Sequence, residues 1–319
     1  MTFDFETIID RRGKDAVAVD APAVQMSGGF FPETKVQEEF SIIPMWVADM
    51  NFQTAPAVAQ AIRSRADHHL YGYFLPPSQY FQSIINWQKE RNGVTDLKPE
   101  HIGYENGVLG GVVSALRILC SNGDPVLVQT PTYVGFTHSL EDNGWKSVLN
   151  PLKRDAEGIW RMDYEDMERK IIENHVHAAI FCSPHNPSGR VWQAWEIEKA
   201  MEIFARHDVY VIADEIWSDL TLPGYHHIPT QSVSEDARNR TIALYSPSKA
   251  FNLAGLVGSY HIVYNAYLRD RIRREATMTH YNHMNVLSMH ALMGAYSEQG
   301  AKWLDALREV IADNQKTAV

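Results

Sequence analysis

The sequence predicts an α/β fold, with a mainly parallel β-sheet that helices cover on both faces. Two observations lead to this prediction: short runs that are apolar throughout recur from about residue 107 onward, and amphipathic helical stretches separate them. Strands that are apolar on both faces are typical of parallel sheets enclosed between helices. The chain has 319 residues, of which 45% are apolar, so it is long enough for one large domain and a smaller one.

The N-terminal segment, residues 1–49, is predicted to be an irregular arm and not a domain. Its stretch "APAVQMSGGFFPETK" reads as a loop. A helix is predicted to start soon after the arm, with Thr54 as the N-cap and with Ala55 and Pro56 in the first turn, where proline is tolerated.

Four apolar runs in the rest of the chain are predicted to be buried strands: Pro125–Gln129, Ala178–Cys182, Val209–Ala213 and Thr241–Tyr245. A helix is predicted between the second and the third, because four apolar residues there share one helical face: Ile197, Ala200, Met201 and Phe204. This alternation of strand and helix is what predicts a parallel sheet.

Charge and composition exclude several classes of protein. The formal net charge is −10, which argues against a nucleic-acid binder, since such proteins need a basic face. No run of about 18 apolar residues occurs, so no membrane span is predicted. The acidic N-terminus does not resemble a signal peptide, and the two cysteines, Cys120 and Cys182, read as free thiols without metal-site spacing. These features predict a cytoplasmic protein without a metal.

A polar or aromatic side chain follows each of the four predicted strands. In chain order these residues are Tyr133, Asn186, Asp214 and Lys249. In open α/β sheets, ligands bind outside the carboxyl ends of the strands. The sequence therefore predicts that a ring, an amide, a carboxylate and an amine face one crevice.

Lys249 and Asp214 together point to pyridoxal 5′-phosphate. Taken alone, Lys249 reads as a surface lysine and Asp214 as a helix N-cap. As a pair they match what the cofactor needs, which is a lysine that forms a Schiff base with its aldehyde and a carboxylate that keeps its ring nitrogen protonated. Asn186 is a turn residue, and its side-chain amide remains able to donate to the ring oxygen of the cofactor. Tyr133 is either an ordinary core residue or a ring that stacks on the cofactor.

A phosphate site is predicted where a helical run begins in "YENGVLGGVVSALRIL". The backbone N–H groups of Val108 and Leu109 at the start of this helix can hold an anion, and the helix dipole favours it. Ser246 and Ser248, on either side of Pro247, can add hydroxyl donors to the same phosphate.

Five motifs in order resemble the fold-type I pyridoxal-phosphate enzymes, the aspartate aminotransferase superfamily: "NGV", "TPTY", "SPHNPSG", "ADEIWSD" and "SPSKAFNLAG". Two further motifs, "PMWVADMNF" and "HIP" around Ile228, resemble the cystathionine β-lyase branch, the MalY/PatB-type C–S lyases. The resemblance runs from about Phe3 to Asn314. It implies the large-domain fold of these enzymes over residues 50–289, preceded by the arm.

The resemblance also implies roles for single residues. Lys249 would form the Schiff base, Asp214 would bind the ring nitrogen, Asn186 the ring oxygen, and Tyr133 would stack. Val108, Leu109, Ser246 and Ser248 would line the phosphate. Tyr73 would reach the phosphate of a neighbouring subunit, which implies a homodimer, and Val47 and Ala48 would approach the substrate carboxylate.

Three departures from the superfamily pattern bear on function. Aminotransferases have a phosphate-binding arginine where this chain has Val257, and the C–S lyase branch also lacks it. Trp217 replaces a tyrosine or histidine of many relatives, and an indole cannot ionise. Residues 290–319 are expected to be the start of a helix that leads to a C-terminal small domain, largely absent here, which in the family supplies an arginine for the substrate carboxylate.

The resemblance therefore implies a C–S lyase that eliminates a thiol from a small sulfur-containing amino acid and yields pyruvate and ammonia. One alternative is a class I/II aminotransferase, because the same residues serve both reactions. Another is a catalytically weak or regulatory protein that binds the cofactor, since the chain has no residue to assign to the carboxylate arginine.

Overall fold

A computed structural model of the chain describes residues 3–20 and 45–318. The chain divides into two compact units, residues 1–54 and 55–319. In the first unit the described residues include one short helix, α1 (Val17–Asp20), and an ion pair in which Arg11 lies 2.5 Å from Asp49. All other elements belong to the second unit, which contains the predicted crevice.

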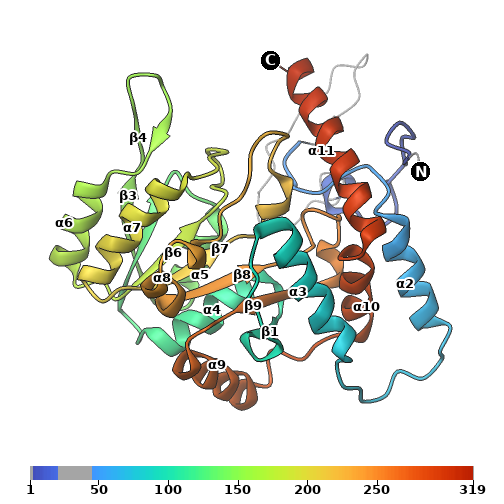
Figure 1. Cartoon of the computed structure of the whole chain (residues 1–319), viewed down its shortest axis with the longest axis horizontal. Helices are drawn as coiled ribbons and strands as arrows, with labels where there is room; N and C mark the ends of the chain where they lie inside the picture. The colour runs from blue at the N-terminus through green and yellow to red at the C-terminus, as the bar shows by residue number, and fades with distance from the viewer. Residues whose placement is uncertain (1–2, 21–44, 319) are drawn as a thin grey trace. The chain divides into compact units, whose positions relative to one another are not determined.

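The second unit is built on a seven-stranded sheet with the strand order β1-β9-β8-β7-β6-β2-β3 (Figure 1). Its strands are β1 (Ile102–Glu105), β2 (Pro125–Thr130), β3 (Lys146–Pro151), β6 (Ala178–Cys182), β7 (Tyr210–Asp214), β8 (Thr241–Tyr245) and β9 (Ser259–Ile262). Strand β9 runs antiparallel to both of its neighbours, and the other neighbouring pairs are parallel. A separate hairpin joins β4 (Lys153–Arg154) to β5 (Trp160–Arg161).

The four predicted strands are present to within one residue at each end, as the neighbouring strands β2, β6, β7 and β8. The prediction of a mainly parallel sheet is confirmed. Strands β1, β3 and β9 were not predicted, because none of them is a continuous apolar run. In β9 the polar residues Ser259 and His261 are buried, and each is hydrogen-bonded to Glu105 on β1.

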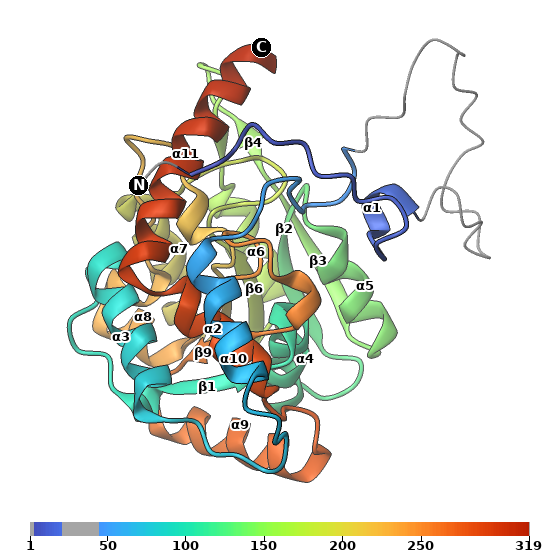
Figure 2. The ribbon, with the colours of Figure 1, turned by 90° about the vertical axis from the view of Figure 1, so that its right-hand side faces the viewer.

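Helices pack on both faces of this sheet, and Figure 2 shows α5 on one side of the strands and α7 on the other. Alternate residues of each strand face opposite layers. Val128 and Ile180 belong to the apolar core shared with α4 and α5, whereas Leu127 and Phe181 belong to the core shared with α6 and α7. The helices are α2 (Pro56–Ala66), α3 (Ser78–Asn92), α4 (Gly107–Leu119), α5 (Val134–Asp142), α6 (Tyr164–Asn174), α7 (Ala194–Arg206), α8 (Glu235–Arg240), α9 (Ala266–Thr279), α10 (Val286–Ala295) and α11 (Glu298–Ala318). Short 3₁₀ turns are η1 (Pro99–His101), η2 (Ser218–Leu220), η3 (Thr230–Ser232) and η4 (Ala254–Leu256).

The predicted apolar face of α7 is buried as expected. The predicted N-cap of α2 is wrong by one residue: Pro56 is the first helical residue, so Ala55 and not Thr54 occupies the cap. Proline lacks a backbone N–H, so at this position one fewer donor needs a capping acceptor.

The C-terminal part of the chain forms two helices, α10 and α11, where one helix starting near His290 was expected. Between them lies Tyr296, followed by Ser297. Its Oγ donates to the Gly294 carbonyl and accepts from the Gly300 N–H, so it ends one helix and caps the next. These helices pack with α2 and α3 beside the β1–β9 end of the sheet (Figure 1).

No helix in the described part of the chain combines the length and the apolar character needed to cross a bilayer.

Candidate active site

The predicted crevice lies at the carboxyl ends of four neighbouring strands. Tyr133, Asn186, Asp214 and Lys249 follow or end β2, β6, β7 and β8 respectively. The register of the sheet pairs Asp214 with Cys182 on one side and with Leu244 on the other. Because the four strands are parallel, all four residues lie at one edge of the sheet.

Asp214 is buried, with 5% of its surface exposed, and its Oδ1 accepts a hydrogen bond from the Ile216 N–H at 3.0 Å. Burial raises the pKa of Asp214 to about 7; the negative charge of Glu215 adds to this rise, whereas the Ile216 N–H and the charge of Lys249 oppose it. The alternative that Asp214 is a helix N-cap does not hold, since the next helical turn begins at Ser218. A buried carboxylate with one backbone donor is well suited to receive a cationic N–H donor.

Lys249 lies four residues after β8, in a turn closed by hydrogen bonds from the Phe251 N–H to the Pro247 carbonyl and from the Leu253 N–H to the Ser248 carbonyl, both 2.9 Å long. The side chain is half-buried, and its Nζ lies 5.6 Å from the centre of the Trp217 ring. Lys249 follows β8 and Asp214 ends the adjacent parallel strand β7, so the amine and the carboxylate lie at the same end of the sheet.

Helix α4 begins at Gly107, as predicted, so Val108 and Leu109 lie in its first turn. The cap residue, Asn106, makes no side-chain cap hydrogen bond. Its amide instead accepts from the Tyr104 hydroxyl at 3.0 Å and donates to the Tyr281 carbonyl. The N–H groups of the first turn are therefore left without a side-chain acceptor, as an anion site at a helix N-terminus requires.

Tyr133 is 39% exposed, so it is not ordinary core. Its ring packs edge-on against Phe136 at 5.5 Å and also covers Gly135, where a Cβ atom would come within 2.4 Å of the tyrosine ring. The same Cβ would come within 3.0 Å of Leu109. The structure thus brings the Tyr133 ring beside the N-terminus of α4.

Ser246 and Ser248 have different surroundings. The Ser246 Oγ is buried, donates to the Gly258 carbonyl, and accepts from the Ser248 N–H at 3.1 Å. Its single proton is already used, so Ser246 shapes the turn before Lys249 and is a poor donor to a phosphate. The Ser248 hydroxyl lies 3.0 Å from the Ser246 Oγ and is the better candidate of the two.

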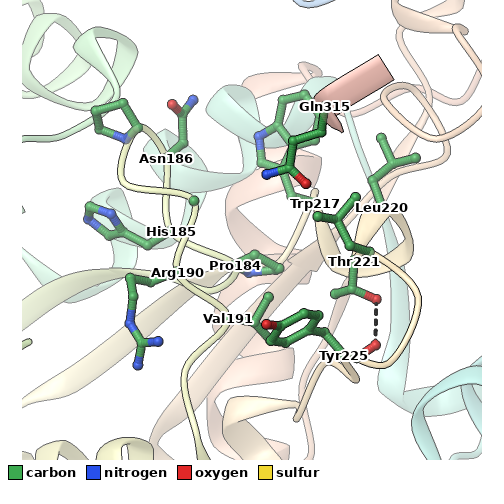
Figure 3. A pocket seen from close by; sticks show the side chains of 13 residues that line it. Pro184, His185, Asn186, Arg190, Val191, Trp217, Leu220, Thr221, Tyr225 and Gln315 are labelled. Carbon is green, nitrogen blue, oxygen red and sulfur yellow. Dashed lines mark hydrogen bonds between the residues drawn. The ribbon is translucent and has the colours of Figure 1, made fainter. Parts of the chain in front are cut away.

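A cavity of about 570 Å³ opens next to Asn186 (Figure 3). One wall is the segment after β6, including Pro184, Asn186 and Val191. The opposite wall is the segment after β7, and Gln315 of α11 contributes from above in this view. The residues of that second wall include Trp217, Leu220, Thr221 and Tyr225. The cavity is therefore lined by both polar and apolar side chains, with Asn186 and Trp217 on facing sides.

Tyr73 does not line this cavity. It is fully exposed and lines a separate hollow with Tyr71, Phe74 and His283. Val47 and Ala48 belong to the first unit of the chain, and their predicted approach to the substrate stays a prediction. Among the residues that the structure describes, no cluster of histidine, cysteine and acidic side chains could hold a metal.

A buried layer directly behind the crevice was not predicted from the sequence. Glu215, next to Asp214, is completely buried and contacts His227 and Tyr245. The acid in "ADEI" was a visible signal, but its partners lie 12 and 30 residues away and no pattern links them.

Comparisons with known proteins agree with this geometry. A family model described as aminotransferase class I and II matches residues 42–319. Cystathionine beta-lyase PatB of Bacillus subtilis is 36% identical over 276 residues, which cover 86% of this chain and 70% of PatB. The crystal structure of cystalysin from Treponema denticola, which contains pyridoxal 5′-phosphate, matches with a TM-score of 0.90 at 31% identity, over 100% of this chain and 78% of cystalysin. The PLP-bound C–S lyase from Staphylococcus hominis matches with a TM-score of 0.88 at 32% identity, over 100% of this chain and 76% of the lyase.

Proposed function

The chain belongs to the aminotransferase class I and II family, and we propose that within this family it is a pyridoxal-phosphate-dependent C–S lyase of the cystathionine β-lyase type. The observation that supports this most directly is the shared site of Asp214 and Lys249 at the ends of adjacent strands. The similarity to PatB and to two solved structures, cystalysin and a C–S lyase, supports the lyase branch.

The described residues fit the cofactor. Asp214 is a buried carboxylate that can accept from the ring nitrogen, and the first turn of α4 offers N–H groups of Val108 and Leu109 to the phosphate. Ser248 can add a hydroxyl donor to the phosphate, Tyr133 a ring face, and Asn186 an amide for the ring oxygen. When bound, pyridoxal 5′-phosphate draws electron density away from the substrate Cα.

Lys249 is the base of the proposed reaction. Its amine removes the Cα proton of a small amino acid with a sulfur substituent on Cβ, and the Cβ–S bond breaks with its electron pair leaving on the thiolate. The remaining enamine is hydrolysed to pyruvate and ammonia. Trp217 lies against Lys249 but cannot ionise, so it can position the amine and cannot replace it as an acid or base.

We also propose a homodimer in the cytoplasm. The segment around Tyr73 supports the dimer, because Leu70, Tyr73 and Leu75 are each at least 70% exposed in the single chain. Its predicted reach to the neighbouring phosphate depends on that second subunit. Both cysteines are free thiols, which supports a reducing compartment.

The lyase and the aminotransferase differ in their products. Cystathionine is incubated with the protein and a thiol reagent, and pyruvate is measured in parallel. A lyase releases thiol and pyruvate in equal amounts, whereas transamination alone releases no thiol. Cofactor binding without either product would favour the catalytically weak or regulatory alternative.

Lys249→Ala tests the site itself. It should remove the visible absorbance of the bound cofactor and the release of thiol. Lys302→Ala is the matched control, since Lys302 is an exposed lysine on α11 paired with Glu298. Unchanged visible absorbance in Lys249→Ala would contradict the assignment.

A further inference from the structure

Glu215 is a carboxylate with no exposed surface, placed immediately behind the candidate site. Burying a carboxylate is costly unless hydrogen bonds satisfy it. Here the Glu215 Oε1 accepts from the Thr230 N–H at 2.8 Å, and Oε2 lies 2.6 Å from the His227 Nε2. The Tyr245 hydroxyl donates to the same Oε2. Three donors thus converge on one carboxylate.

These contacts join the two strands that present the candidate cofactor residues. Glu215 follows Asp214 at the end of β7, and Tyr245 is the last residue of β8, four positions before Lys249. The Glu215 backbone N–H also donates to the Leu244 carbonyl at 2.9 Å. Successive residues of an extended strand point to opposite sides. Asp214 therefore faces the site while Glu215 holds the strand ends together behind it.

Lys249 follows Tyr245 by four residues, and hydrogen bonds hold the segment between them in place. The buried Ser246 Oγ accepts from the Ser248 N–H and donates to the Gly258 carbonyl. The turn that follows is closed by the hydrogen bond from the Phe251 N–H to the Pro247 carbonyl. A displacement of Tyr245 would therefore be transmitted to Lys249.

We propose that Glu215 is a positioning residue, which acts through Tyr245 and His227 to set the placement of Lys249 and Asp214 around the cofactor. The proposal rests on the cofactor site of the proposed function. Functional side chains must be held to within about 0.5 Å by the residues that support them. A cluster that bonds both strand ends at once provides such support.

The charge of Glu215 gives the proposal a measurable signature. A negative charge near the Lys249–cofactor linkage favours its protonated form. Replacing Glu215 by glutamine removes that charge, and it places an amide where donors now converge. The midpoint pH at which the visible absorbance of the bound cofactor changes should therefore fall, by about 0.5 pH unit or more.

The experiment compares three variants of the 319-residue chain, loaded with pyridoxal 5′-phosphate. Glu215→Gln should lower the spectral midpoint and raise the dissociation constant of the cofactor about tenfold, a typical loss for a supporting residue. Tyr245→Phe deletes one hydroxyl and keeps the carboxylate, and it should weaken cofactor binding in the same direction. Glu196→Gln is the control, because Glu196 is equally buried and is bound by Arg161 and Arg190. It should lose stability without a change of the spectral midpoint.

The outcomes separate the two proposals. Glu215→Gln and Tyr245→Phe could both behave as Glu196→Gln does, losing stability while the spectral midpoint and the cofactor affinity stay unchanged. In that case Glu215 has only a structural role, and the inference is overturned. If Glu215→Gln does not fold, the cofactor affinity of Tyr245→Phe decides. If the unmodified chain itself shows no visible absorbance with the cofactor, both the inference and the proposed function fail.

Discussion

The Nζ of Lys249 lies 5.6 Å from the centre of the Trp217 ring, so the amine of the candidate site faces an indole. The two residues come from the turns that follow adjacent strands, β8 and β7. An aromatic face attracts a cation and also excludes water from it. Trp217 therefore contacts the Lys249 amine and also lines the cavity next to Asn186.

Replacing Trp217 tests this relationship. Trp217→Leu should lower kcat/KM for a cysteine S-conjugate by about tenfold, since a cation–π contact contributes about 0.5–2 kcal/mol. Trp217→Phe should lose less, because it keeps a ring face. Trp195→Leu is the control: Trp195 makes a similar contact with Arg161 on the surface of α7 and should leave kcat/KM unchanged. Equal losses in Trp217→Leu and Trp195→Leu would show that the contact with Lys249 is irrelevant.

The raised pKa of Asp214 predicts a pH-dependent stability. The pKa is about 7 in the folded protein, against an ordinary 3.8, because the carboxylate is buried. Without cofactor, the native state binds this proton more tightly than the unfolded chain, so the free energy of unfolding falls as the pH rises from about 4 to about 7. Asp214→Asn removes the titration and should make the cofactor-free protein more stable, by up to about 4 kcal/mol at pH 8 and by little at pH 4.

Urea denaturation of the cofactor-free protein at both pH values measures this difference. Asp236→Asn is the control with the opposite sign, since its hydrogen bond with Arg240 lowers the pKa of Asp236 and stabilises the native state above about pH 4. Asp214→Asn should also bind pyridoxal 5′-phosphate more weakly than the unmodified chain does. A variant that is less stable than the unmodified chain at pH 8 without cofactor would refute the argument.

Gly135 has little room for a side chain, because the Tyr133 ring covers it. A methyl group at Gly135 would come within 2.4 Å of that ring. Gly135→Ala should therefore move the ring and weaken cofactor binding about twofold to tenfold, as expected for losing about 0.5–1.5 kcal/mol of stacking. Gly255→Ala is the control, since a Cβ there meets no atom within 4 Å. Titration with the cofactor, followed by absorbance, measures the affinity of each variant. Equal cofactor affinities of Gly135→Ala and Gly255→Ala would mean that Tyr133 does not stack on the cofactor.

The sequence was sufficient for the central strands and for much of the crevice, and the physical reason is the same in both cases. Strands buried on both faces are apolar wherever no partner satisfies a polar side chain, so β6, β7 and β8 are visible as nearly continuous apolar runs, and the polar residues that end or follow them stand out. Asp214 and Lys249 were predicted in this way, and the structure places both at the carboxyl ends of adjacent strands.

The remaining features depend on contacts between distant parts of the chain. Strand β9 is polar by composition, and it is buried because Glu105 on β1 satisfies its serine and histidine. Ser246 appears in the sequence as a phosphate ligand, yet its proton is used by the Gly258 carbonyl. The partners of Glu215 are likewise set by the tertiary fold. Spacing along the chain contains no information on such pairings.

Arg308 links α11 to the loop that forms one wall of the cavity. Its Nε donates to the Thr221 carbonyl at 2.6 Å and its Nη2 to the Leu222 carbonyl at 3.4 Å. Thr221 in turn donates from its Oγ1 to the Tyr225 carbonyl at 3.0 Å, a bond drawn in Figure 3. One guanidinium therefore bonds two consecutive carbonyls of a loop that is also bound by α3, through the hydrogen bond from the Trp87 Nε1 to Asp219.

Arg308→Met keeps most of the length of the side chain and removes these donors, so the Thr221 carbonyl loses a charged partner. The free energy of unfolding should fall by about 1–3 kcal/mol. Hydrogen exchange should accelerate in residues 218–225 and stay unchanged in β6, because the loop loosens while the sheet does not. Lys302→Met, on the same helix but exposed, should change neither measurement. If exchange in residues 218–225 were the same in Arg308→Met as in the unmodified chain, the loop would be held by its other contacts, such as the hydrogen bond from Trp87 to Asp219, and Arg308 of α11 would not stabilise this wall of the cavity.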